Sequence, residues 1–237
     1  MARAFRATTR GYTADLDAHE RRLISGLCAD VIQLLEARAA EVSGAAEVKA
    51  RPQTPQHDDD AASTAGSEPS EIASSQAEDD DVFAHFRREL EGLGEEVPDA
   101  GMAPPEDPVL ARLLPDAWSP DHASDRGEAG QFRRLSEASL RESKISDLRT
   151  ARMLLESSPV RLREEQAPIF GRALNDLRLT LSVRLGIEDE DDAEQIHQMA
   201  VDGGAKTTET FMAEIYTFLT WLQETLFSAM LDVLPDE

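Results

Sequence analysis

The sequence predicts an all-α fold: a single compact helical domain with a long acidic insertion after its first helix. Residues 207–234 form the most hydrophobic run of the chain, with apolar side chains at steps of three, four or seven. Residues 17–43 and 162–186 show the same helical spacing. Residues 44–80 are instead rich in Ala, Ser, Pro, Gln and acidic residues. They are predicted to be disordered because few apolar side chains can offset their conformational entropy.

The N-terminal part, residues 1–43, is predicted to contain an arm and the first helix. Residues 2–13 are mildly basic and fit either a short strand or an extended arm, and the sequence leaves both open. Asp17 and Glu20 have the spacing of a capping box, so a helix is expected from here to about Gly44. Cys28 lies on or near its apolar face and is expected to be buried.

The remainder, residues 81–237, is predicted to complete the same domain. Helical spacing returns over residues 79–93, and Asp107 followed by Pro108 has the form of a helix start. Residues 128–157 are expected to be one long helix or two joined near Ser143. Its expected apolar positions are Phe132, Leu135, Leu140, Ile145, Leu148 and Leu155. Its basic residues form a solvated face paired with carboxylates or a partner-docking face: Arg133, Arg134, Arg141, Lys144, Arg149 and Arg152.

Three sequence patterns predict the structure of the C-terminal third of the chain. Gly186 stands where a cap should end the helix over residues 162–186. The acidic run 188–192 lacks the residue order of a calcium loop and is predicted to be a solvated loop. Thr207 or Thr208 is predicted to cap the last helix. The two adjacent apolar stripes of this helix indicate that it is buried in the core or between subunits. A homodimer is therefore one of the possibilities that the sequence allows. The stripes are Phe211, Ile215, Phe218, Leu222, Leu226 and Val233, and beside them Met212, Tyr216, Leu219, Phe227, Met230 and Leu234.

Composition and charge narrow the function classes. A formal net charge of −23 opposes generic binding to nucleic acid or to an anionic membrane. Cys28 is the single cysteine, which excludes an intramolecular disulfide and a cysteine zinc site within one chain. We find no catalytic, cofactor or metal motif, no secretory signal and no membrane span, so a cytoplasmic, non-enzymatic interaction protein is expected. A direct DNA-binding regulator and a helical adaptor unrelated to transcription are the alternatives.

Three motifs carry a resemblance to a known family: EDPVLARLLPD at residues 106–116, ALNDLRL followed by RLG within 173–186, and YTFLTWLQETL at 216–226. In order and spacing the chain resembles the actinobacterial oxidative stress regulator (AosR) family, long catalogued as a domain of unknown function. The resemblance implies a cytoplasmic regulator of transcription under oxidative stress, working through protein contacts, for example with a sigma factor.

The resemblance also selects candidate residues. The motifs supply Arg112, Asp116, Asn175, Asp176, Arg178 and Gln223. With Lys144 of the basic segment 128–157, they form either a partner-contact site or a buried polar network that holds the helices in register. A regulator that switches by an internal disulfide needs two cysteines, and this chain departs from that pattern. Cys28 is therefore a redox candidate through an intermolecular disulfide or a capped sulfenic acid, or else a slow structural thiol.

Overall fold

The computed structural model describes residues 2–50, 102–116, 126–202 and 207–232. Residues 1–44 and 101–237 belong to one compact unit. The predicted insertion beyond Ala50, the predicted helix over residues 79–93 and the last residues of the predicted apolar stripes lie outside the described residues. The division of the chain at residues 43 and 80 therefore stays a prediction.

The N-terminal residues form two strands of a small antiparallel sheet and not an extended arm. β1 (Arg3–Thr8) and β2 (Gly11–Asp15) form a hairpin, and β3 (Val160–Leu162) adds to the far edge of β2 in the order β1-β2-β3. Gly11 has a φ of 107°, and a Cβ at this position would lie 2.1 Å from the carbonyl oxygen of Leu162. Glycine is thus required here by both the backbone conformation and the close approach of β3. Among its described residues the helical domain accordingly carries three strands, of which the sequence indicated at most one.

Helix α1 (Ala18–Ala50) begins with the predicted capping box. Asp17 Oδ1 accepts from the backbone N–H groups of His19 and Glu20 at 2.7 and 2.9 Å, and Asp17 N–H donates to Glu20 Oε2 at 2.8 Å. The predicted end near Gly44 is wrong, because the helix continues to Ala50. A single glycine costs a helix only about 1 kcal/mol, and the sequence AAEVKA that follows Gly44 is rich in helix formers.

Helices α3 (Pro108–Leu113) and α4 (Arg126–Leu154) follow. Asp107 caps α3 as predicted, with Oδ1 accepting from the N–H groups of Val109 and Leu110 at 2.7 and 3.0 Å. Helix α4 is one continuous helix, so the alternative of two helices joined near Ser143 is wrong. A cis peptide bond between Ser158 and Pro159 lies between α4 and β3.

In the first half of α4, the buried side of the helix is not the apolar side that the sequence predicted. Phe132, Leu135 and Leu140 are exposed by 50%, 78% and 39%, whereas Ile145, Leu148 and Leu155 are buried as expected. The positions that face inward in this half carry charged residues instead: Arg133, Glu137 and Arg141. The interpretation of the basic residues as one solvated face is therefore wrong for Arg133 and Arg141. These side chains can be buried because they neutralise a buried carboxylate. The spacing of apolar residues in the sequence does not reveal such a pairing of charges.

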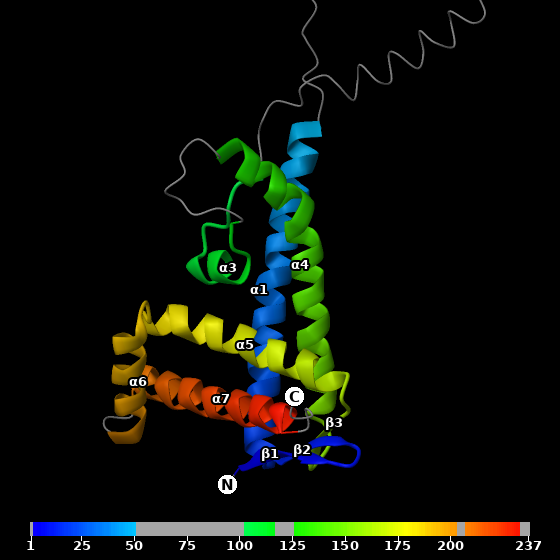
Figure 1. The fold of residues 1–237 in the computed structure, drawn as a ribbon. Coiled ribbons are helices and arrows are strands. Elements are labelled where there is room, and N and C mark those ends of the chain that lie inside the picture. The colour runs from blue at the N-terminus through cyan, green and yellow to red at the C-terminus, as the bar shows by residue number, and fades with distance from the viewer. Residues whose placement is uncertain (1, 51–101, 117–125, 203–206, 233–237) are drawn as a thin grey trace, which may run out of the picture. The chain divides into compact units, whose positions relative to one another are not determined.

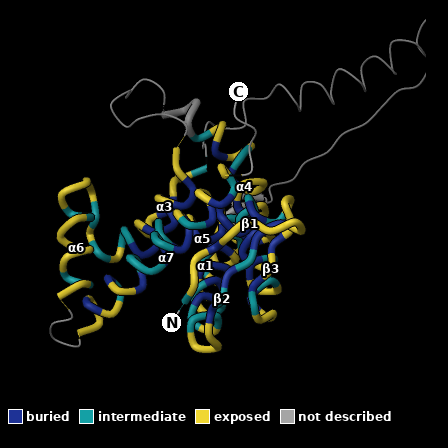
Figure 2. The backbone as a smooth tube through the Cα atoms, turned by 60° about the horizontal axis from the view of Figure 1, so that its bottom comes forward, coloured by how far each residue is buried: buried dark blue, intermediate teal, exposed yellow. Residues whose placement is uncertain are grey.

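Helix α5 (Gln166–Leu185) begins four residues later than predicted, because Leu162 belongs to β3. Its end is as predicted: Gly186 has a φ of 69°, and the N–H of Ile187 donates to the carbonyl of Ser182 at 2.9 Å. Helix α6 (Glu190–Asp202) was not predicted. The acidic run starts this helix and is not a loop, since Asp189 Oδ1 accepts from the N–H of Asp192 at 3.0 Å. Figure 2 shows that α6 is exposed along most of its length, with Ile196 as its buried residue.

Helix α7 (Thr208–Leu231) lies beside α5, and Figure 1 shows the pair running across α1 and α4. Thr207 is the N-cap, with Oγ1 accepting from the N–H of Thr210 at 3.1 Å. Two predicted stripe residues, Phe211 and Phe227, are 50% and 41% exposed, because the helix buries one side against α5, α6 and the sheet. The buried side carries the core contacts of this helix: Ala213, Ile215, Leu219, Leu222, Leu226 and Ala229.

Candidate functional site

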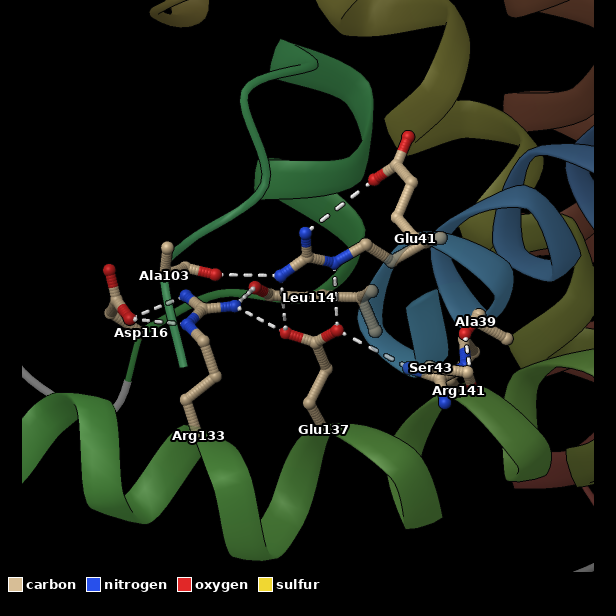
Figure 3. A network of polar contacts seen from close by, with 10 residues as sticks. Ala39, Glu41, Ser43, Ala103, Leu114, Asp116, Arg133, Glu137 and Arg141 are labelled. Atoms are coloured by element: carbon tan, nitrogen blue, oxygen red, sulfur yellow. Dashed lines mark hydrogen bonds and ion pairs between the residues drawn. The ribbon is translucent and has the colours of Figure 1, made fainter. Parts of the chain in front are cut away.

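The most densely connected polar group of the described structure centres on Glu137 of α4, whose side chain is 2% exposed (Figure 3). Its Oε1 accepts from Arg38 Nε at 3.0 Å and from Arg141 Nη1 at 3.3 Å. Its Oε2 accepts from Arg133 Nη1 at 3.0 Å. Three guanidinium groups from two helices thus surround one buried carboxylate, which provides the paired charge that burial of an ion requires.

The same network holds the segment 102–116 against α1 and α4 (Figure 3). Arg133 donates to the Leu114 carbonyl at 3.0 Å and, through Nε, to Asp116 Oδ1 at 3.0 Å. Arg38 Nη2 donates to the carbonyl of Ala103 at 2.6 Å. These contacts reach both ends of the segment that contains α3, so the network fixes the position of that segment.

A second set of buried polar contacts joins α4, α5 and α7. Lys144 Nζ donates to Asp176 Oδ1 at 2.6 Å. Burial raises the pKa of the Asp176 carboxyl, and the nearby ammonium of Lys144 opposes this effect only in part. Arg178 donates through Nη1 to Gln223 Oε1 at 2.5 Å, and Gln223 Nε2 donates to the Gly171 carbonyl at 3.0 Å. The second set therefore connects neighbouring helices directly.

The candidate residues divide into two groups by position. Asp116, Lys144, Asp176, Arg178 and Gln223 all bond to other elements through their side chains. Arg112 on α3 and Asn175 on α5 are exposed, and α3 packs against α5. The structure brings Lys144 together with Asp176 and Arg178 with Gln223, whereas Asp116 bonds to Arg133 of α4, which was not among the candidates.

Sequence reasoning did not select Glu137 or Arg38 as candidates, and it placed Arg133 and Arg141 on either a solvated face or a partner-docking face. A signal was present, because Arg133, Glu137 and Arg141 are spaced by four residues and so lie on one side of a helix. That side is continued by Leu148 within α4 and by Leu155 just after it. The spacing could have indicated that the charged side chains share the inward face of the helix.

Cys28 of α1 is fully buried, as expected. Burial raises the pKa of its thiol to about 12, and the positive charge of Arg152 offsets this only in part. Because the thiolate is the form that reacts with peroxides and alkylating agents, the environment of Cys28 disfavours both reactions.

We expect native Cys28 to be alkylated slowly, and at the same rate before and after treatment with peroxide. The physical reasons are its burial and the raised pKa of its thiol. Timed labelling with iodoacetamide, followed by intact-mass measurement, tests this, with the protein in urea as the control for full reactivity. Fast native labelling that is lost after peroxide, or a dimer that reductant dissolves, would make Cys28 a redox switch.

In the part of the chain that the structure describes, no three His, Cys, Asp or Glu side chains gather in a way that could hold a metal ion. Within the same residues, no helix has both the length and the apolar character needed to cross a membrane.

Comparison with known proteins places the chain in a family. The family described as Domain of unknown function (DUF2017) matches residues 2–230. The chain belongs to this family. A relative from Mycobacterium leprae (strain TN) is 36% identical over 138 residues, which is 54% of this chain and 60% of the relative. Its name is "Putative oxidative stress regulator AosR". The resemblance found in the sequence motifs is thereby confirmed.

The chain covers 60% of the length of that relative. No solved structure matches the chain.

Proposed function

We propose that this protein is a non-enzymatic regulator in the oxidative stress response. The observation that carries the proposal is its 36% identity to a relative named as an oxidative stress regulator. We further propose that it acts in the cytoplasm on transcription through protein contacts, with a sigma factor as an example of a partner.

The arrangement of the polar residues supports a non-catalytic role. The buried carboxylates of Glu137 and Asp176 are engaged by arginine and lysine side chains of neighbouring helices. General acid or base catalysis needs such a group to be within reach of a substrate. These two carboxylates instead connect α1, α4 and α5.

The state of Cys28 supports regulation by contact and not by the protein's own thiol. A buried thiol with a pKa of about 12 is almost entirely protonated at neutral pH. The oxidative signal would then reach this protein through its partner.

Two exposed residues provide the contact surface in this proposal. Arg112 and Asn175 lie on the adjoining helices α3 and α5, and both belong to motifs of the family resemblance. The segment bearing Arg112 is held in place by Arg38 and Arg133, so its surface is presented in a fixed position. Arginine is favoured at protein interfaces, where its guanidinium makes directional bonds with carboxylates.

Binding of purified sigma factors to the purified full chain tests the proposal. We expect one of them to bind, and Arg112→Glu to weaken the complex about tenfold through charge repulsion. Arg184→Glu is the matched control, because Arg184 is an exposed arginine at the end of α5. If no sigma factor binds, or if both variants weaken binding equally, the contact surface proposed here is wrong.

Measuring the affinity for duplex DNA at increasing salt concentration tests the alternative that the protein binds DNA directly. Tight binding that weakens steeply as salt rises would favour a direct DNA-binding regulator. The net charge of −23 leads us to expect no such binding. A helical adaptor unrelated to transcription would bind neither DNA nor a sigma factor.

A further inference from the structure

A groove lined by four arginines lies between the first turns of α1 and the last turns of α4. Its volume is about 620 Å³, within the range of roughly 300–1,000 Å³ that is usual for small-molecule sites. Arg21 and Arg22 line it from α1, and Arg149 and Arg152 line it from α4. Glu156 is the one carboxylate among its lining residues.

Within the described residues, three of these four guanidinium groups form no ion pair with a carboxylate. Arg22 Nε donates to the Ala18 carbonyl at 2.9 Å, and Arg152 Nε donates to Ser25 Oγ at 3.4 Å. Arg21 Nη1 donates to the Leu155 carbonyl at 3.0 Å. Arg149 alone of the four forms an ion pair within the described residues, with Glu36 at 2.7 Å. The groove differs in this respect from the Glu137 network, where guanidinium groups surround a carboxylate.

Arg21 supplies a second observation. Its Nη1 donates to the carbonyls of Leu155 and Glu156, just after α4, and these bonds hold one end of the guanidinium in place. Its Nε is buried, however, and has no hydrogen-bond partner among the described residues. A buried N–H without an acceptor is costly, so Arg21, which lines the groove, keeps an unsatisfied donor.

The local charge contrasts with the charge of the whole chain. A net charge of −23 repels an extended polyanion over its full length, whereas a small anion inside the groove meets mainly the nearby guanidinium groups. Arginine matches phosphate oxygens with paired N–H donors. Ala18, Met153 and Leu155 add apolar surface to the same groove, which suits an organic group attached to the phosphate.

We propose that this groove binds a small phosphorylated ligand, with Arg22 and Arg152 as its principal contacts and Arg21 and Arg149 beside them. The site is separate from the Arg112 and Asn175 surface and does not depend on the proposed function. It gives the protein a way to respond to a phosphorylated small molecule.

Calorimetric titration of the full chain with inorganic pyrophosphate tests the proposal. We expect saturable binding, and we expect Arg22→Gln combined with Arg152→Gln to weaken it by about tenfold or more, because two charge-assisted contacts are lost. Both side chains are exposed, so the double variant should keep the thermal stability of the native chain. Arg134→Gln, on the exposed side of α4, is the matched control and should bind pyrophosphate normally.

The absence of binding, or an equal loss of affinity in the Arg134→Gln control, would overturn the proposal. Co-sedimentation with phosphatidylcholine vesicles that contain phosphatidic acid identifies the source of the phosphate. Binding to pyrophosphate but not to the vesicles indicates a soluble ligand. Vesicle binding that pyrophosphate abolishes indicates the same site occupied by a lipid headgroup.

Discussion

Glu137→Gln is expected to destabilise the protein by about 3–5 kcal/mol, which is the usual cost of removing one partner from a buried ion pair. The variant keeps the shape of the side chain but removes the negative charge that Arg38, Arg133 and Arg141 share. Arg133 still has Asp116 as a partner, and Arg38 still has Glu41 at 3.6 Å, whereas Arg141 is left without a described carboxylate partner. Thermal unfolding should show a loss on the order of 10 °C.

Two further variants show whether charge is the cause. Glu142→Gln removes a carboxylate from an exposed position of the same helix and should leave the melting temperature within a few degrees of the native value. Glu137→Gln combined with Arg141→Gln should lose less stability than the sum of the two single variants, because the second change removes the uncompensated charge. Strictly additive losses would show that Glu137 and Arg141 do not interact.

The parts of the fold that the sequence predicted well are those fixed by nearby residues. The capping box of Asp17 and Glu20, the cap at Asp107 and the left-handed Gly186 each involve atoms within a few residues of one another. Such chemistry is visible in a short window of sequence. The helix starts at Ala18 and Pro108 and the helix end at Leu185 were accordingly located to within a residue.

The parts that the sequence did not predict depend on distant partners. Arg38 and Glu137 are 99 residues apart, and nothing near either residue indicates that the other will be buried against it. The three residues of β3 form a strand because β2 pairs with them, since so short a segment has little preference of its own.

The candidate site, like the fold, could be predicted from the sequence only in part. The motifs selected Asp176, Arg178 and Gln223, which the structure places in contacts between helices. They did not select Glu137, because the apolar pattern of Phe132, Leu135 and Leu140 suggested that the other side of α4 faced inward. Burial of a charged side chain becomes favourable only when its partners are known, and those partners lie on other elements.

The other large effect is expected at Leu222, at the centre of the buried side of α7. Its side chain is fully buried in the core that also contains Leu219 and Leu226. Leu222→Ala should cost about 2–5 kcal/mol, from the lost apolar contacts and the cavity that remains. Leu222→Asp adds a buried carboxylate with no cation to pair with, which costs several kcal/mol more. Because domains are stable by only about 5–15 kcal/mol, this variant should be largely unfolded.

Circular dichroism and urea unfolding measure both variants, and Leu231→Asp is the matched control. Leu231 lies in the same helix but is 65% exposed, so the same chemical change there should cost less than about 1 kcal/mol. The order of stability should therefore be native, Leu231→Asp, Leu222→Ala and Leu222→Asp. A Leu222→Asp protein with the native unfolding midpoint would mean that this face of α7 is open to solvent. The packing of α7 against α5 and the sheet would then be wrong, since that packing is what buries Leu222.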